Sequence, residues 1–256
     1  MDPTGTSSAT YGIAGDGRVA THFARYFELL GLPFRQWSRR VPRQSLDGCD
    51  TILLLVSDPA IDTLAAQYPD RTCVHFSGSH ISALAHGMHP LMSFGRELYD
   101  VEQYRRVPFV AEDPALFRRL FPRLPNPCHG IRIEDKARYH ALCAMAGNFT
   151  GFLWAKLLHD FPATLGIPVE AALPYLEQVC RNIAASPSQP ERFLTGPIVR
   201  GDAATVEKHL QALDGDPYGA VYAAFARVAS RVEAVAAAAF TAIMAHRLQA
   251  GSSPSR

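Results

Sequence analysis

The chain has 256 residues, of which 48% are hydrophobic and 19% are charged. This composition excludes an intrinsically disordered chain, because such chains lack the apolar residues that build a core. Lys and Arg number 25 against 24 Asp and Glu, which gives a formal net charge of +1. So small a charge produces no field that would attract nucleic acid, and no nucleic-acid partner is expected.

The cysteines and the apolar runs indicate where the protein works. The cysteines are odd in number and contain no C-x-x-C pair, so a disulfide framework or zinc ribbon is not expected and the reducing cytoplasm fits best. The first ten residues carry neither a positive charge nor an apolar run and do not resemble a signal peptide. The longest apolar stretch, residues 234–245, is shorter than the roughly 20 residues of a membrane span. We therefore expect a cytoplasmic protein with no membrane partner.

Short apolar runs alternate with helical stretches from residue 10 to about residue 132. The predicted strands cover residues 11–14, 34–37, 51–56 and 72–76, and a predicted helix covers residues 19–30. The run at 51–56 contains almost only β-branched residues and leucine, as in a parallel strand that is covered on both faces. Strands that alternate with helices are typical of βαβ crossovers and a parallel sheet.

From residue 133 onward the pattern is helical. Helices are predicted at residues 134–160, in a stretch that ends at residue 185, at 202–213 with Asp202 as N-cap, and from Asp216-Pro217 to residue 248. The predicted fold class is therefore α/β, with an N-terminal Rossmann-type parallel sheet (residues 1–132) followed by an all-helical C-terminal domain (residues 133–256).

A dinucleotide fingerprint, G-x-G-x-x-G/A, lies between the first strand and the first helix. Its first glycine permits the tight turn, its second lets a pyrophosphate approach the backbone, and its alanine allows close packing of helix on strand. The free N–H groups at the helix N-terminus then face the phosphates. We expect a dinucleotide to bind against Gly15, Gly17, Arg18, Val19 and Ala20.

The end of the second strand indicates which dinucleotide is bound. Sites for NAD place an acidic residue there, whereas this chain has Ser38-Arg39-Arg40, and arginines suit the 2′-phosphate of NADP. The alternative is a solvated basic loop. Asp16 argues against any cofactor, because its carboxylate would repel pyrophosphate unless it points outward or is neutralised by Arg18.

Several segments, in order along the chain, resemble Rossmann-like proteins that carry a DUF2520 C-terminal domain. These proteins are related to ketopantoate reductase, pyrroline-5-carboxylate reductase and 6-phosphogluconate dehydrogenase. The resemblance implies an NADP-binding N-terminal domain, with Ser57 and Asp58 at the cofactor, and a helical domain that supplies a homodimer interface. The segments that carry it are residues 12–23, 57–61, 75–79, 89–94 and 136–140, Asn148, and residues 195–202.

The better-known relatives carry a Lys-x-x-x-Asn pair on the first long helix of the second domain, where the lysine is the acid or orienter. The matching residues here are Lys136 and His140, which share one helix face and are expected to point into the cleft between the domains. In that position Lys136 would donate a proton to the alkoxide that forms as hydride arrives, and His140 would relay it or bind a carboxylate. Without the resemblance, the simpler interpretation is that Lys136 and His140 have no role in a site. They would then be an exposed lysine and a half-buried histidine on an amphipathic helix.

Four further residues are candidates for binding substrate. Asn148 either reaches the substrate or bonds a neighbouring helix, and Arg200 would clamp a carboxylate. Ser77 lies at the carboxyl end of a strand, where ligands of open α/β sheets gather. His89 either closes the cleft or belongs to a plain turn.

These residues together predict an NADP-dependent reductase that transfers hydride to the carbonyl of a small carboxylate-bearing oxo acid. Fold analogy favours a reaction like that of ketopantoate reductase. The alternatives are a non-catalytic NADP-binding or sensor protein, an imine reductase and a coenzyme F420-dependent reductase. No metal is expected, because His80, His86 and His89 lack the spacing of a metal motif.

Overall fold

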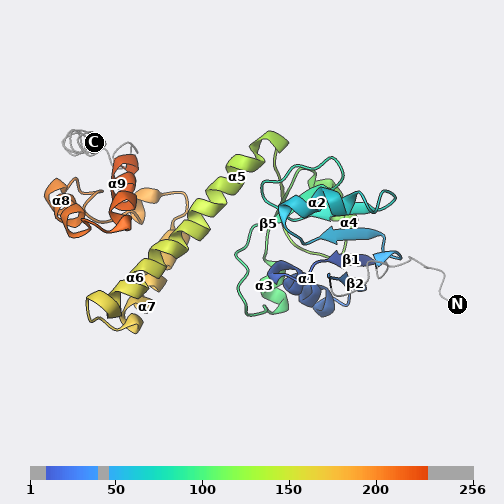
Figure 1. Ribbon diagram of the computed structural model, residues 1–256, viewed down its shortest axis with the longest axis horizontal. Helices are drawn as coiled ribbons and strands as arrows, with labels where there is room; N and C mark the ends of the chain where they lie inside the picture. The colour runs from blue at the N-terminus through green and yellow to red at the C-terminus, as the bar shows by residue number, and fades with distance from the viewer. Residues whose placement is uncertain (1–9, 40–45, 230–256) are drawn as a thin grey trace. The chain divides into compact units, whose positions relative to one another are not determined.

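The computed structural model describes residues 10–39 and 46–229 of the chain (Figure 1). The chain divides into two compact units, residues 1–155 and residues 156–256, each of which is described by itself. The domain boundary after residue 132 remains a prediction from sequence.

The first unit is built on a sheet of seven strands in the order β2-β1-β3-β4-β5-β6-β7. Neighbouring strands are parallel except for the antiparallel pair of β5 and β6. The predicted α/β class is confirmed, and the four strands predicted from sequence are its first four. The strands are β1 (Tyr11–Ala14), β2 (Phe34–Trp37), β3 (Thr51–Leu54), β4 (Thr72–His75), β5 (His86–Pro90), β6 (Phe109–Ala111) and β7 (Cys128–Gly130).

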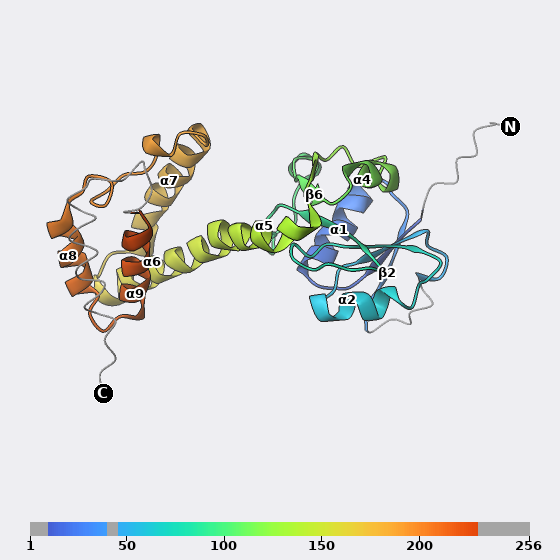
Figure 2. The ribbon, with the colours of Figure 1, turned by 90° about the horizontal axis from the view of Figure 1, so that it is seen from above.

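Helices cover both faces of this sheet (Figure 2). Successive side chains of a strand point to opposite faces, so each strand contributes to two cores. On one face Ile13 and Val74 pack in a cluster with residues of α1 (Arg18–Leu29), α3 (Val101–Arg105) and α4 (Pro114–Leu120). On the other face Ile52 and Cys73 pack in a cluster with residues of α2 (Asp58–Ala65).

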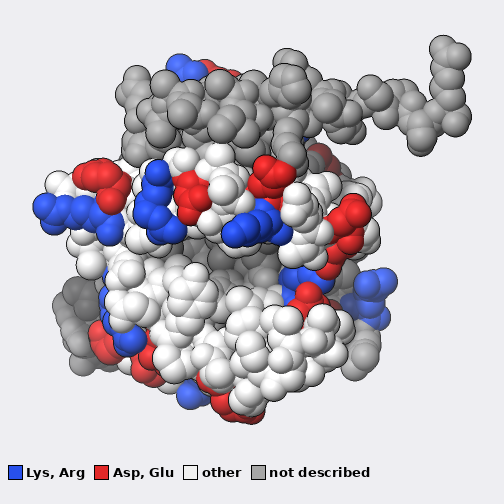
Figure 3. Space-filling model, turned by 90° about the vertical axis from the view of Figure 1, so that its left-hand side faces the viewer, with Lys and Arg blue, Asp and Glu red and all other residues white. Residues whose placement is uncertain are grey.

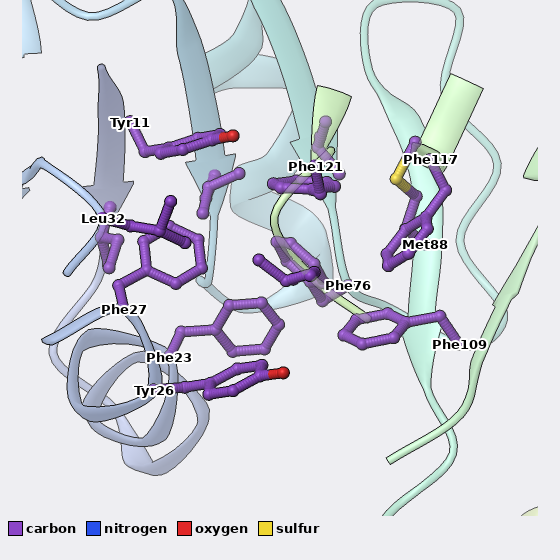
Figure 4. Close-up of a cluster of buried hydrophobic side chains, with 14 of the residues drawn as sticks. Tyr11, Phe23, Tyr26, Phe27, Leu32, Phe76, Met88, Phe109, Phe117 and Phe121 are labelled. Atoms are coloured by element: carbon purple, nitrogen blue, oxygen red, sulfur yellow. The ribbon is translucent and has the colours of Figure 1, made fainter. Parts of the chain in front are cut away.

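The first of these cores is rich in aromatic rings, many of which lie edge-on or tilted to one another, as aromatic pairs prefer (Figure 4). Tyr11 contacts the rings of Phe27 and Phe121, which ties β1 to α1 and to the end of α4. Phe23 of α1 contacts Phe76, the residue that follows β4. These contacts fix α1, and with it the phosphate turn, on the sheet.

One continuous helical run spans Ile133–Thr164. It consists of a 3₁₀ turn (Ile133–Asp135), α5 (Lys136–Cys143), a π-helical segment (Ala144–Phe149) and α6 (Thr150–Thr164). By length and composition alone this helix could cross a membrane. Both lysines of this helix interact with the rest of the protein, however. Lys136 is buried in the first unit, and Lys156 forms ion pairs with Asp160 and Asp216 in the second.

The second unit is helical, as predicted. After α6 come a 3₁₀ turn (Val169–Ala172), α7 (Leu173–Ala185), a 3₁₀ turn (Pro190–Arg192), α8 (Ala203–Ala212) and α9 (Pro217–Ala229). Asp202 caps α8 by accepting a hydrogen bond from the Thr205 N–H. Residues 230–248 of the predicted last helix lie outside the described residues, as does the apolar stretch 234–245. On the face drawn in Figure 3, basic and acidic side chains are interspersed beside an uncharged surface.

Candidate functional site

The glycine turn after β1 has the geometry of a phosphate site. Gly15 adopts a φ of 141°, and a β-carbon there would overlap the carbonyl oxygen of Leu55, so only glycine fits. Gly17 is the N-cap of α1, and a β-carbon there would meet nothing within 4 Å. No side chain caps the first N–H groups of α1. The turn therefore presents free backbone donors to open space, which is what an anion requires.

A cleft of about 910 Å³ opens at this turn, along the carboxyl ends of β1 to β5. It brings together most of the residues that the sequence analysis assigned to the cofactor. Ala20 lies buried behind the turn and does not line the cleft, and Arg40 lies outside the described residues. The predicted residues on its walls are Gly15, Gly17, Arg18, Val19, Ser38, Arg39, Ser57, Asp58, Ser77 and His89.

A second helix N-terminus reaches the same cleft. Ser57 is the N-cap of α2, and its side chain caps none of the first N–H groups; Pro59 has no N–H, and the Ala60 N–H donates to the Ser57 carbonyl at 2.9 Å. Asp58 accepts a hydrogen bond of 2.8 Å from the Ser77 hydroxyl, which joins α2 to the loop after β4. Ser77 Oγ in turn accepts from the backbone N–H of His80. Ser77 is thus held in place at the wall of the cleft.

The phosphate turn carries two charged residues, which have different surroundings. The Arg18 guanidinium donates to the carbonyl of Phe94, at 3.4 Å, across the cleft. Asp16 is exposed on the cleft wall and forms no ion pair with any described residue. The carboxylate of Asp16 is therefore left without the neutralisation by Arg18 that the sequence analysis considered.

Lys136, the first residue of α5, is buried rather than exposed. Its side chain is 5% exposed, and its ammonium pairs with Glu112 Oε1 at 2.9 Å. The ammonium occupies the space above Gly87 of β5, where a β-carbon would overlap Nζ. Because Gly87 has no side chain, the Lys136 ammonium has room to lie against the carboxyl end of the sheet.

His140 lies one helical turn further along α5. Its imidazole sits over Gly78, where any β-carbon would overlap Nδ1. The rings of His140 and His89 are 5.5 Å apart and nearly perpendicular, and His89 Nδ1 is 2.8 Å from the Tyr139 hydroxyl. Burial, reinforced by the positive charges of His140 and Lys136, lowers the pKa of His89 to about 4, so His89 is neutral near pH 7. His89 belongs to β5, not to a plain turn.

The lysine site adjoins the nucleotide cleft. Ser77, His89 and Lys136 surround one small internal space together with Glu112 and Tyr139. Ser77 and His89 also line the large cleft. Three of the residues that the sequence analysis assigned to chemistry or substrate thus meet at the carboxyl edge of the sheet.

The other two candidates do not line either of these spaces. Asn148 is exposed on the π-helical segment, and Arg200 is exposed in a turn of the second unit. Their roles remain predictions. Among the described residues, no group of three or more His, Cys, Asp or Glu side chains is arranged to hold a metal ion.

Glu112 and Tyr139 were not predicted from the sequence. Glu112 follows β6, a strand of only three residues that has no clear β pattern in the sequence. Tyr139 was accessible to sequence reasoning, since it lies three residues after Lys136 and so shares its side of the helix.

The sheet, its helices and the glycine turn define a Rossmann-type fold followed by a helical unit. Residues 110–229 match the family model described as "Domain of unknown function (DUF2520)", in agreement with the resemblance stated from the sequence. The match begins 23 residues before the helical region predicted from sequence. A search of the curated proteins finds no match to this chain.

Solved structures share the fold at low sequence identity. A Bacteroides fragilis protein, provisionally described as an NADP oxidoreductase, superposes with a TM-score of 0.70 at 19% identity, over 86% of this chain and 97% of that one. For the Thermotoga maritima protein TM1727 the TM-score is 0.62 at 20% identity, over 93% and 99% of the two chains. Plasmodium falciparum pyrroline carboxylate reductase, solved with NADP bound, gives a TM-score of 0.56 at 9% identity, over 86% and 98%. Likeness at these identities shows the fold.

Proposed function

We propose that this protein is an NADP-dependent reductase that transfers hydride to the carbonyl of a small carboxylate-bearing oxo acid, as ketopantoate reductase does. The observation that carries the proposal is the junction of two sites. A cleft with two helix N-termini adjoins a buried ammonium at the carboxyl ends of the strands, where ligands of open α/β sheets bind. The description of the similar structures as NADP oxidoreductases and NADP-bound reductases supports the same class.

The residues present fit NADP. The open space over Gly17 and the uncapped N–H groups of α1 suit a pyrophosphate, and Arg39 at the cleft wall suits a 2′-phosphate. When bound, NADPH supplies the hydride, and the protein supplies orientation and electrostatics. Ser77 and His89 line the same cleft at the carboxyl ends of β4 and β5 and would contact the bound cofactor.

Lys136 is the proposed acid. Its ammonium is buried beside Glu112, so it is held in one position rather than free in solvent. A carbonyl that accepts hydride develops negative charge on oxygen, and a positioned ammonium stabilises that charge and donates the proton. His140, stacked over Gly78, would help to position the substrate.

The charges at this site favour a carbonyl over an imine as substrate. An imine becomes a cation when it is activated, and a fixed ammonium opposes that charge, whereas it stabilises a developing alkoxide. His89 is neutral near pH 7 and adds no positive charge of its own. The neutral ring instead offers a hydrogen-bonding partner to a substrate hydroxyl or carboxylate.

A non-catalytic NADP-binding or sensor role is the second candidate. The observation in its favour is Asp16, whose exposed carboxylate lies on the wall of the phosphate site without an ion-pair partner among the described residues. A carboxylate in that place weakens the attraction for pyrophosphate. Turnover separates this role from that of an enzyme.

The test is a fluorescence titration of the purified chain with NADPH and with NADH, repeated with ketopantoate while NADPH absorbance is followed. Tighter binding of NADPH than of NADH, with NADPH consumption, is expected. Binding without consumption on ketopantoate and a panel of other oxo acids and imines would favour the sensor. Failure to bind either nucleotide would contradict both roles.

We further propose that the protein works in the cytoplasm as a homodimer. Large apolar side chains on the long helix are exposed, with Leu142 at 57% and Phe152 at 64% exposure. Exposed apolar patches of this kind are typical of protein–protein interfaces. In a homodimer the same patch of a second copy would bury them.

A further inference from the structure

His75, the last residue of β4, is a buried histidine with no role in the site described above. Its side chain is fully buried, between Leu54 of β3 and Gly87 of β5 in the strand register. Neither of its ring nitrogens has a hydrogen-bond partner among the described residues. Buried polar groups in proteins are nearly always paired, so an unpaired imidazole calls for an explanation.

The neighbours of His75 connect it to the proposed acid. Its Cε1 and Nε2 atoms both lie 3.1 Å from the point where a β-carbon of Gly87 would stand, and the ammonium of Lys136 occupies that same space. The Cε1–Nε2 edge of His75 and the ammonium of Lys136 therefore adjoin the same space, with no hydrogen bond between them in this structure. The missing side chain of Gly87 is what allows the two groups to approach.

His75 also lies beside a second histidine, which is near the surface. The ring of His80 lies 5.3 Å from the ring of His75, edge-on at 79°. His80 Nε2 is in turn 3.3 Å from Oδ2 of Asp62, whose side chain is 49% exposed. Lys136, His75, His80 and Asp62 thus form a row of titratable groups from the buried ammonium to the surface.

The charges around His75 keep it neutral. Burial, together with the positive charges of Lys136 and His80, lowers its pKa to about 4, against the opposing effect of Asp58 and Asp62 of α2. A neutral imidazole carries one N–H and one lone pair, so it can release a proton from one nitrogen while it takes one at the other.

We propose that His75 is a positioning residue that returns a proton to Lys136 from solvent, by way of His80. The inference rests on the proposed function. When an N–H bond of Lys136 breaks and the proton passes to the substrate oxygen, the neutral amine takes a proton from Nε2 of His75 as Nδ1 takes up a proton that solvent water supplies through His80. Lys136 is then charged as before and His75 is neutral, with its proton on Nδ1, and a flip of the imidazole ring restores an N–H on the side of Lys136 for the next turnover.

The first arm of the test needs no turnover. In the full chain labelled with ¹⁵N-histidine, a pH titration by NMR gives the pKa and tautomer of His75, and Lys136→Met removes the neighbouring cation. We expect the pKa of His75 to rise by about one unit in that variant, because a nearby charge shifts a buried histidine by that order. An unchanged pKa would show that the two groups are not coupled and would overturn the proposal.

The second arm uses NADPH and ketopantoate. In His75→Gln we expect turnover to fall about tenfold or more, with a larger solvent isotope effect and a changed pH profile, while the Kd for NADPH stays the same. His80→Gln, at a partly exposed position, should show the same effects more weakly and serves if His75→Gln does not fold. The matched control is His129→Gln on the exposed face of β7, which should behave as the wild type.

The two arms separate the failure of the relay from the failure of the proposed function. Wild-type turnover and an unchanged pH profile in both His75→Gln and His80→Gln would overturn the relay. If the wild-type chain consumes no NADPH with any substrate, the proposed function fails, and the NMR titration alone decides whether His75 exchanges protons with Lys136.

Discussion

The imidazole of His140 lies directly over the α-carbon of Gly78, with its Nδ1 and Cγ atoms inside the volume of a β-carbon at that position. The two residues come from α5 and from the loop after β4. Their contact seats the first turns of the long helix on the carboxyl edge of the sheet, next to the proposed acid.

This contact predicts that Gly78→Ala moves His140. The new methyl group overlaps the ring, and overpacking of this kind costs about 1–3 kcal/mol in the free energy of unfolding. Gly147→Ala is the matched control, because a β-carbon there meets nothing within 4 Å and alanine favours a helix. Chemical denaturation should show a loss for Gly78→Ala and no loss for Gly147→Ala; equal stability of the two variants would contradict the placement of His140.

Arg39 is expected to set the preference for NADP. A hydrogen bond to a charged group contributes about 1.5–3 kcal/mol, so Arg39→Ala should raise the Kd for NADPH at least tenfold and leave the Kd for NADH nearly unchanged. The control, Arg119→Ala on α4, removes an exposed arginine that does not line the cleft. Equal losses for both nucleotides would mean that Arg39 does not contact a 2′-phosphate.

Two buried histidines predict how stability depends on pH. The pKa values of His75 and His89 are lowered to about 4, below the 6.5 of an unfolded histidine, so the unfolded chain binds more protons between these values. Their contribution to stability is complete above about pH 6.5 and is lost as pH falls toward 4. At about 1.4 kcal/mol per pKa unit, the loss is on the order of a few kcal/mol.

Carboxylates that protonate in the same range also destabilise the folded chain, so the comparison of variants is what isolates the histidines. Denaturation of the wild type, His75→Gln and His129→Gln at pH 7 and pH 4.5 measures this difference. The fall in stability should be smaller in His75→Gln than in the other two. The same fall in all three chains would contradict a neutral, buried His75.

The exposed apolar side chains of the long helix predict self-association. Leu142, Met145, Phe149 and Phe152 recur every three or four residues, and a glutamate in this stripe would place a charge against apolar surface. Phe152→Glu should therefore shift the wild-type dimer to monomer in light scattering after size-exclusion chromatography. Leu84→Glu, an exposed leucine outside the stripe, should leave the dimer intact. A monomeric wild type would contradict the proposed assembly.

Sequence patterns predicted the part of the fold that local chemistry determines. Residues 34–37 form a strand as predicted, and the strand at 51–56 ends two residues early, at Leu54. Strand β5, with the sequence His-Gly-Met-His-Pro, was not predicted, because its strand form comes from pairing with β4 and β6 rather than from propensity.

In the site, too, the features set by local sequence were predictable and those set by long-range contacts were not. The glycine turn was readable because Gly15 has a conformation and a close contact that no other residue tolerates. The burial of Lys136 was not readable, since it depends on Glu112, 24 residues earlier, and on the space above Gly87. Pairings of that kind arise only when the strands of a sheet come together.

The most direct test of the reductase compares Lys136→Met with the wild type in NADPH binding and in single-turnover reduction of ketopantoate. Methionine keeps the apolar stem of the side chain and removes the ammonium. Loss of a positioned general acid is expected to slow hydride transfer by about 10²–10⁴-fold, while the Kd for NADPH changes little. If NADPH affinity and the rate fall together by similar factors, or if the rate is unchanged, Lys136 is not the acid and the account of this site is wrong.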